Sequence, residues 1–139
     1  MPVGVYTLTN DMVVKGDSFI RTTPAPTEIT TAGAATYTAA QVLSGIIIRD
    51  PSGGSRTDVL PTAALLVAAM AEEKVGDTVE VMVVNTADAA ETITISAGTG
   101  GNFHSSQTAA SKVIAQNETK ILKIRITGVG SNAAYVVYM

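Results

Sequence analysis

The sequence predicts an all-β fold, an antiparallel sandwich or barrel that carries one short helix. Short runs in which apolar and polar residues alternate recur along the chain, and this is the periodicity of half-buried strands. Clusters of glycine, proline, asparagine and aspartate separate these runs, as turns do. Short strands joined by turns bury their apolar faces by packing in two layers or by closing into a barrel.

The first 35 residues are expected to be separate from the main domain. Three short β-prone runs come first, at residues 3–8, 12–14 and 18–21. Residues 22–35 contain Pro24, Pro26 and Gly33 among small side chains, so they cannot form a helix or a central strand. We expect residues 1–35 to be an extended arm that reaches a neighbouring protein, with a long surface loop as the alternative. Residues 36–139 then form the domain.

The domain begins with a helical turn, a strand and a loop. Thr38 suits the N-cap of one helical turn within residues 37–43. The β-branched run at residues 46–48 is typical of a strand that is buried on both faces. In residues 49–58, Pro51 and a glycine pair predict a loop, along which four charges alternate in sign.

Residues 61–73 have the clearest helical pattern. Pro61 suits a first helical position, and Leu65, Leu66, Ala69 and Met70 form one apolar stripe. A glycine at position 76 is expected to end the helix.

Residues 77–97 predict a central hairpin. The first arm alternates about Val79, Val81 and Val83, and the second arm alternates about its isoleucines. The polar residues 85–91 between the arms favour a tight antiparallel turn. Met82 and Val84 lie on the second face of the first arm, so we expect another sheet or another subunit to cover that face.

Three further segments complete the expected sheets. Residues 111–115 are predicted to form one strand, and residues 133–138 the closing strand. Residues 121–127 alternate plainly, which places one set of side chains inward (Leu122, Ile124 and Ile126) and another outward (Lys123 and Arg125).

Composition favours a protein that covers much of its surface with partners. Charged residues make up 15% of the 139 residues, whereas about 25% is typical of globular domains. A Thr-rich surface on a solitary sandwich is the alternative. The net charge of -3 argues against binding nucleic acid. The N-terminal residues lack the pattern of a signal peptide, and no apolar run approaches the ~18 residues of a membrane span.

Few residues suit catalysis or cofactor binding. With no cysteine, a disulfide or thiolate zinc site is impossible. His104 is the only histidine, and nothing in the sequence places an acid beside it and Ser105 or Ser106, as a catalytic triad requires. A calcium site in residues 50–58 is conceivable, but the EF-hand spacing is absent. We expect no enzymatic activity, no cofactor and no metal.

Protein contact is the function class that these features favour. Lys112, Lys120, Lys123 and Arg125 have Glu118 as their only nearby acid, which indicates a solvated strand face or an electrostatic contact with an acidic protein. The candidate interface residues are Arg49, Asp50, Arg56, Asp58, Met82, Val84, Lys123 and Arg125.

Three segments carry a resemblance to known proteins. They read TYTAAQVLSGIIIRDPSGGSRTDVLPTAALLVAAM from Thr36, VVNTADAAETITISAGTGG from Val83 and IAQNETKILKIRITGVGSNAAYVVY from Ile114. Together these segments resemble a family of small virion proteins of tailed bacteriophages. The first 35 residues lie outside the resemblance.

The resemblance implies a jelly-roll-like capsid decoration or cement protein. Such a protein binds the outer surface of the major capsid protein, commonly as a homotrimer, and stabilises the head by bridging capsid subunits. The chain would be made in the host bacterial cytoplasm and end in the virion. The alternative is a receptor- or glycan-binding module of a phage head or tail fibre. Sugar sites usually present aromatic platforms, and the chain has no tryptophan.

Overall fold

The computed structural model describes residues 6–8, 12–15, 18–21 and 24–139. The first three of these segments are β1 (Tyr6–Leu8), β2 (Met12–Lys15) and β3 (Ser18–Arg21), which form an antiparallel sheet in the order β1-β2-β3. The β-prone runs near the N-terminus are therefore strands where the chain is described. Residues 1–35 were expected to reach a neighbouring protein, and most of them lie outside the residues whose side chains the structure describes.

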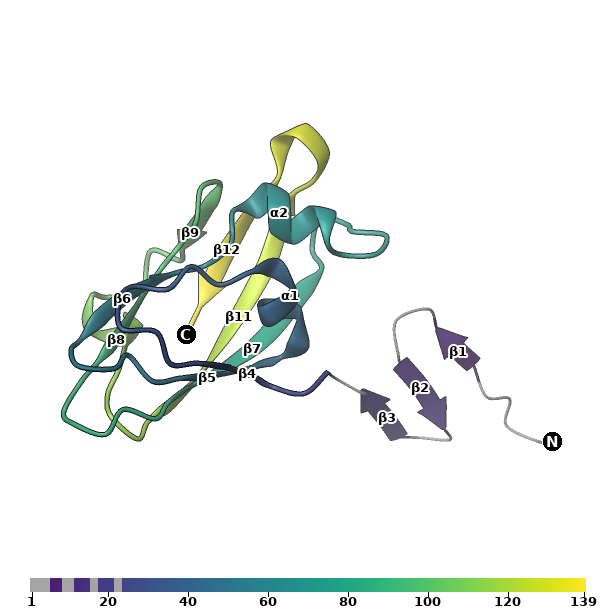
Figure 1. Ribbon diagram of the computed structural model, residues 1–139. Coiled ribbons are helices and arrows are strands. Elements are labelled where there is room, and N and C mark those ends of the chain that lie inside the picture. The colour runs from purple at the N-terminus through teal and green to yellow at the C-terminus, as the bar shows by residue number, and fades with distance from the viewer. Residues whose placement is uncertain (1–5, 9–11, 16–17, 22–23) are drawn as a thin grey trace.

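Two β-sheets form the body of the protein (Figure 1). The larger sheet has six strands in the order β4-β5-β7-β11-β12-β9, which are β4 (Thr27–Ile29), β5 (Ile46–Arg49), β7 (Thr78–Asn85), β11 (Thr119–Gly128), β12 (Ala134–Tyr138) and β9 (Gly101–Phe103). The smaller sheet has the order β10-β8-β6, which are β10 (Val113–Ile114), β8 (Ile93–Ser96) and β6 (Arg56–Val59).

The mostly-β class is confirmed, but the sheets are mixed and not antiparallel throughout. β5 runs parallel to both β4 and β7, β6 is parallel to β8, and β9 is parallel to β12. Parallel neighbours require a crossover connection. Two short helices supply such connections, because α1 (Ala39–Ser44) lies between β4 and β5 in the chain and α2 (Ala63–Ala68) lies between β5 and β7.

The predicted central hairpin is wrong. β7 pairs with β5 and with β11, whereas β8 belongs to the other sheet. Asn85 turns the chain between the sheets: its side-chain amide donates to Glu91 O at 2.9 Å and to Ile114 O at 3.0 Å. Its Oδ1 accepts from Ala87 N at 3.0 Å. A polar turn between two alternating runs does not tell a hairpin from a step to a second layer.

The helical turn at α1 is confirmed, with Thr38 and Gln41 forming a reciprocal capping box. The second helix is shorter than expected. Thr62 is its N-cap, and the chain leaves the helix at Ala69, well before residue 73. Glu72 has a φ of 53°, a left-handed conformation that cannot continue a helix.

The core lies between the two sheets, and both helices cover the same face of the six-stranded sheet (Figure 1). The alternation in β11 is confirmed, because Leu122, Ile124 and Ile126 are fully buried. Residues 111–115 form a strand only in part, since the 3-10 helix η1 (Ala110–Lys112) precedes the two-residue β10. A second 3-10 helix, η2 (Gly130–Asn132), leads into β12.

Buried Tyr135 joins β12 to the loops above the core. Its hydroxyl donates to Pro61 O and accepts from Gly98 N, each at 2.9 Å. Gly101 leaves room for this ring, because a Cβ there would lie 2.1 Å from the tyrosine Cζ. The bond to Pro61 connects residues 74 positions apart in the sequence. The bond from Gly98 connects residues 37 positions apart.

Candidate functional site

The outer face of the six-stranded sheet is the candidate interaction face. It consists of the side chains that alternate with the buried ones, and the strand register arranges them in rows. Glu28, Ile48, Val84 and Thr119 form one row; Ile46, Met82 and Ile121 form the next; Glu80, Lys123 and Tyr138 form the third; Thr78, Arg125, Val136 and Asn102 form the fourth. Both helices and the smaller sheet lie on the other side of this sheet (Figure 1).

The centre of the outer face is apolar. Ile46, Ile48, Met82 and Val84 are half-buried by their neighbours alone, and Ile121 is 53% exposed. A contiguous apolar patch of this kind, bordered by polar residues, marks an interaction site. Within residues 24–139, therefore, the face is open to a partner.

Charged residues border the apolar centre. Lys123 Nζ lies 3.0 Å from Glu80 Oε1, and both side chains are 56% exposed. Among the described residues, no ion pair involves the neighbouring Arg125, which is exposed. Glu28 lies at the opposite edge, on β4. The face thus offers an apolar centre with a basic side and an acidic edge.

Four of the residues expected at an interface do lie together on this face, namely Met82, Val84, Lys123 and Arg125. The sequence reasoning missed Ile121, Ile46, Ile48 and Tyr138. Ile121 could have been found from the sequence, because its side chain lies on the same face of β11 as those of Lys123 and Arg125. The pairing of β5 beside β7 is a tertiary feature that no local pattern reveals.

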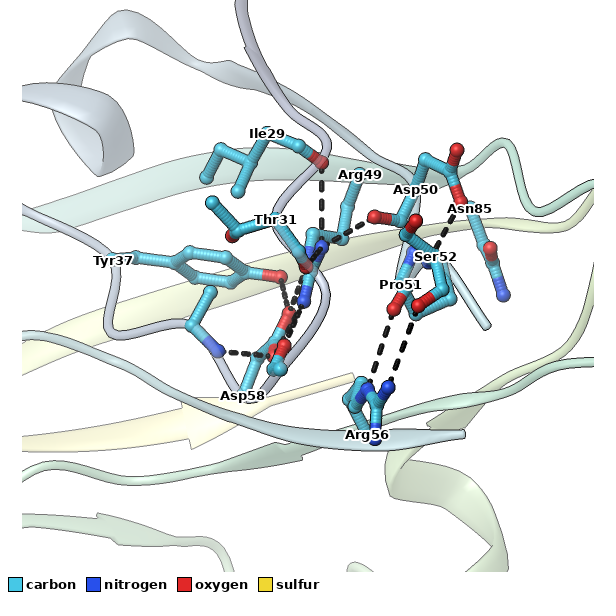
Figure 2. A network of polar contacts seen from close by, with 12 residues as sticks. Ile29, Thr31, Tyr37, Arg49, Asp50, Pro51, Ser52, Arg56, Asp58 and Asn85 are labelled. Atoms are coloured by element: carbon cyan, nitrogen blue, oxygen red, sulfur yellow. Dashed lines mark hydrogen bonds and ion pairs between the residues drawn. The ribbon is translucent and has the colours of Figure 1, made fainter. Parts of the chain in front are cut away.

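Arg49 and Asp58 were expected at an interface, and this is wrong. Both side chains are completely buried, with Arg49 Nε 2.8 Å from Asp58 Oδ2 (Figure 2). The Tyr37 hydroxyl donates to the same carboxylate oxygen at 2.8 Å, and Ala35 N donates to Oδ1 at 2.7 Å. Charges that alternate in sign along residues 49–58 predicted an exposed loop. Instead, Arg49 lies on β5 and Asp58 on β6, and both strands direct these side chains inward.

Arg49 also holds the segment before α1 in place. Its Nη1 donates to Thr31 O at 3.0 Å and to Ile29 O at 3.4 Å, and its Nη2 donates to Gly33 O (Figure 2). A further donor bond reaches Asp50 O. Because a guanidinium has five N–H donors, it can satisfy several carbonyls of a segment with little regular structure. This buried group therefore fixes residues 29–33 against the sheet.

Asp50 and Arg56, the other two expected interface residues, stabilise their own loop. Asp50 Oδ1 accepts from Ser52 N at 2.9 Å, and Arg56 donates to Pro51 O at 3.3 Å and to Ser52 O at 3.4 Å (Figure 2). Both side chains are half-buried. Closing the loop in this way accounts for their charges without a partner.

Two buried tyrosines are expected to make the fold less stable at alkaline pH. Burial, and then the Asp58 carboxylate, raise the pKa of Tyr37 far above its usual value of 10.0. Burial also raises the pKa of Tyr135. Above pH ~10 the unfolded chain loses these protons while the folded chain keeps them. The contribution of each tyrosine to stability is therefore present below pH ~10 and is lost as the pH rises toward its pKa in the folded protein. For the strongly shifted Tyr37 the loss is about 1.4 kcal/mol per pH unit.

Urea unfolding from about pH 8 to about pH 11 measures this loss. We expect Tyr37→Phe to reduce the alkaline slope by about 1.4 kcal/mol per pH unit, because the strongly shifted buried phenol is removed. Tyr138→Phe is the matched control, since it removes a hydroxyl from a residue that is 36% exposed. An equal slope in wild type and Tyr37→Phe would refute the assignment.

His104 lies at one end of the outer face. Its ring stacks on Tyr138 with centroids 5.1 Å apart, and its Nδ1 lies 2.8 Å from Ser106 Oγ. Both partners of this local hydrogen bond are exposed. Among the described residues there is also no group of three or more histidines, cysteines and acids that could hold a metal ion.

Comparison of the chain with protein-family models, curated proteins and solved structures gives no match. Within the part of the chain that the structure describes, no helix has the length and apolar character needed to cross a membrane.

Proposed function

We propose that the protein is a structural virion protein, a capsid decoration or cement protein that binds the outer capsid surface and bridges capsid subunits. The open apolar face on β5, β7 and β11 is the observation that carries this proposal. The resemblance of residues 36–138 to small phage virion proteins supplies the kind of assembly. Under this proposal the two β layers are a variant of the jelly-roll-like form expected of that family.

A cement protein needs binding energy that is spread over a broad area. Burying apolar surface contributes about 25 cal/mol per Å² removed from water. Permanent assemblies typically bury more than ~2,000 Å² per interface. A flat sheet face provides such an area, and its half-buried side chains are already ordered by the strands beside them. Little further entropy is lost when a partner covers them.

The partners are the major capsid protein and further copies of this chain in a homotrimer. In a cyclic trimer each copy presents one surface to the next, so the acidic edge at Glu28 of one copy can approach Lys123 and Arg125 of another. Complementary charges at the border of an interface fix its register and orientation more than its affinity.

Removal and re-addition of the protein tests this function. Virions without it should survive heat or osmotic shock less well, because fewer contacts oppose the pressure of the packaged genome. Adding the purified protein back should restore survival. If depleted and complete virions survive equally, the protein does not act as a cement.

A further inference from the structure

A second site lies at the edge of the smaller sheet, away from the outer face. A cavity of about 340 Å³ is lined by Thr94, Ile95, Ser96, Ala97, Phe103, Ala109 and Lys112. It forms because the ladder between β8 and β10 has only two residue pairs, Thr94 with Val113 and Ile93 with Ile114. Before β10 the chain forms η1, so the β8–β10 pairing does not continue beyond Thr94.

The backbone of β8 forms the floor of the cavity. Arg56 N donates to Thr92 O and Leu60 N donates to Ser96 O, so the even-numbered residues here direct their backbone groups toward β6. Ile95 directs its own backbone groups to the other side, but the whole residue is only 1% exposed. The groups that a ligand can reach are therefore the side chains of the lining.

Lys112 provides a positive charge at this cavity. Its Nζ lies 4.6 Å from the centre of the Phe103 ring. A cation–π contact holds the ammonium group in place without neutralising it. Among the described residues Lys112 forms no ion pair, and the cavity lining contains no acid. The charge remains available to an anion.

Hydroxyl groups and an apolar wall complete the lining. Thr94 and Ser96 lie on the side of β8 opposite the core, and Ser96 Oγ uses its proton to donate to Asp58 O at 3.3 Å. Its lone pairs can accept from a ligand hydroxyl. Phe103, Ala97 and Ala109 form the apolar part. A ligand that matches all of these groups has a carboxylate, several hydroxyls and an apolar ring face.

We propose that this cavity binds an acidic sugar of about one ring, with the carboxylate on Lys112 and the hydroxyls on Thr94 and Ser96. The size and the mixed lining fit a single ring better than an extended chain. The proposal is independent of capsid decoration, because none of these residues lies on the outer face of the six-stranded sheet.

Titration of the whole protein with methyl glucuronoside, monitored by amide NMR, tests the site. We expect saturable shifts at residues 93–97 and 112, and binding about tenfold or more tighter than that of uncharged methyl glucoside. Lys112→Gln should reduce glucuronoside binding to the level of the glucoside. Lys74→Gln removes the same charge at an exposed position outside the cavity lining and should leave glucuronoside binding unchanged.

Thr94→Val is a second variant that preserves side-chain shape, and it should weaken the binding of both sugars several-fold. The proposal is overturned if the glucuronoside causes no shifts at tens of millimolar, or if the glucoside binds equally well. It is also overturned if N-acetylglutamate binds as tightly as the glucuronoside, because the site would then recognise carboxylates in general. An equal loss in Lys74→Gln would overturn it too, because binding would then depend on net charge alone.

Discussion

Replacing Asp58 with alanine is expected to lower the free energy of unfolding by about 3–5 kcal/mol, the usual cost of leaving one member of a buried ion pair without its partner. The Arg49 guanidinium would lose its anion while it remains completely buried. The Tyr37 hydroxyl and Ala35 N would lose their acceptors at the same time. Urea denaturation monitored by circular dichroism measures the change.

Two variants separate this cost from that of an ordinary ion pair. Glu80→Ala breaks the exposed pair with Lys123 and should cost no more than about 1 kcal/mol. Asp58→Asn removes the charge but keeps an oxygen acceptor for Tyr37 and Ala35, so it should be less destabilised than Asp58→Ala. A loss below about 1 kcal/mol in Asp58→Ala would contradict a buried, unscreened pair.

Replacing Ile121 with glutamate is expected to weaken attachment to capsids about a hundredfold or more. The side chain is at the centre of the outer face, where a carboxylate would be buried against apolar groups without a partner. Because Ile121 is exposed in the free protein, folding should be nearly unaffected. Binding of the purified variant to capsids that lack the protein measures the effect by co-sedimentation.

Leu65→Glu is the matched control for this experiment. Leu65 is 62% exposed, comparable to Ile121, but it lies on α2 at the other side of the sheet. The control should bind capsids like the wild type. If both variants bind normally, the outer face makes no contact with the capsid; if both lose binding, added charge rather than location is responsible.

Local patterns predicted much of the sheet but not its pairing. The alternation of Leu122, Ile124 and Ile126 located β11 and its buried side, and Thr38 located the start of α1. These features depend on residues only a few positions apart. The partners of β7 depend on where the chain goes after Asn85, and the side chain of Asn85 satisfies carbonyls in two distant segments.

The residues expected at an interface show the same difference between local pattern and tertiary packing. Strand alternation identified the outward side chains of Met82, Val84, Lys123 and Arg125. This alternation is a property of each strand and does not depend on which strand lies beside it. Arg49 and Asp58 were assigned from their charges, yet burial depends on β5 and β6 facing each other across the core. A buried guanidinium that holds irregular backbone has no periodic signature in the sequence.

A density map of intact particles tests most directly whether the outer face of the six-stranded sheet is held against other proteins. We predict density for this chain on the capsid surface, with Met82, Val84 and Ile121 covered by capsid subunits or by neighbouring copies. A chain that turns this face to solvent, or that is absent from purified particles, would contradict the account.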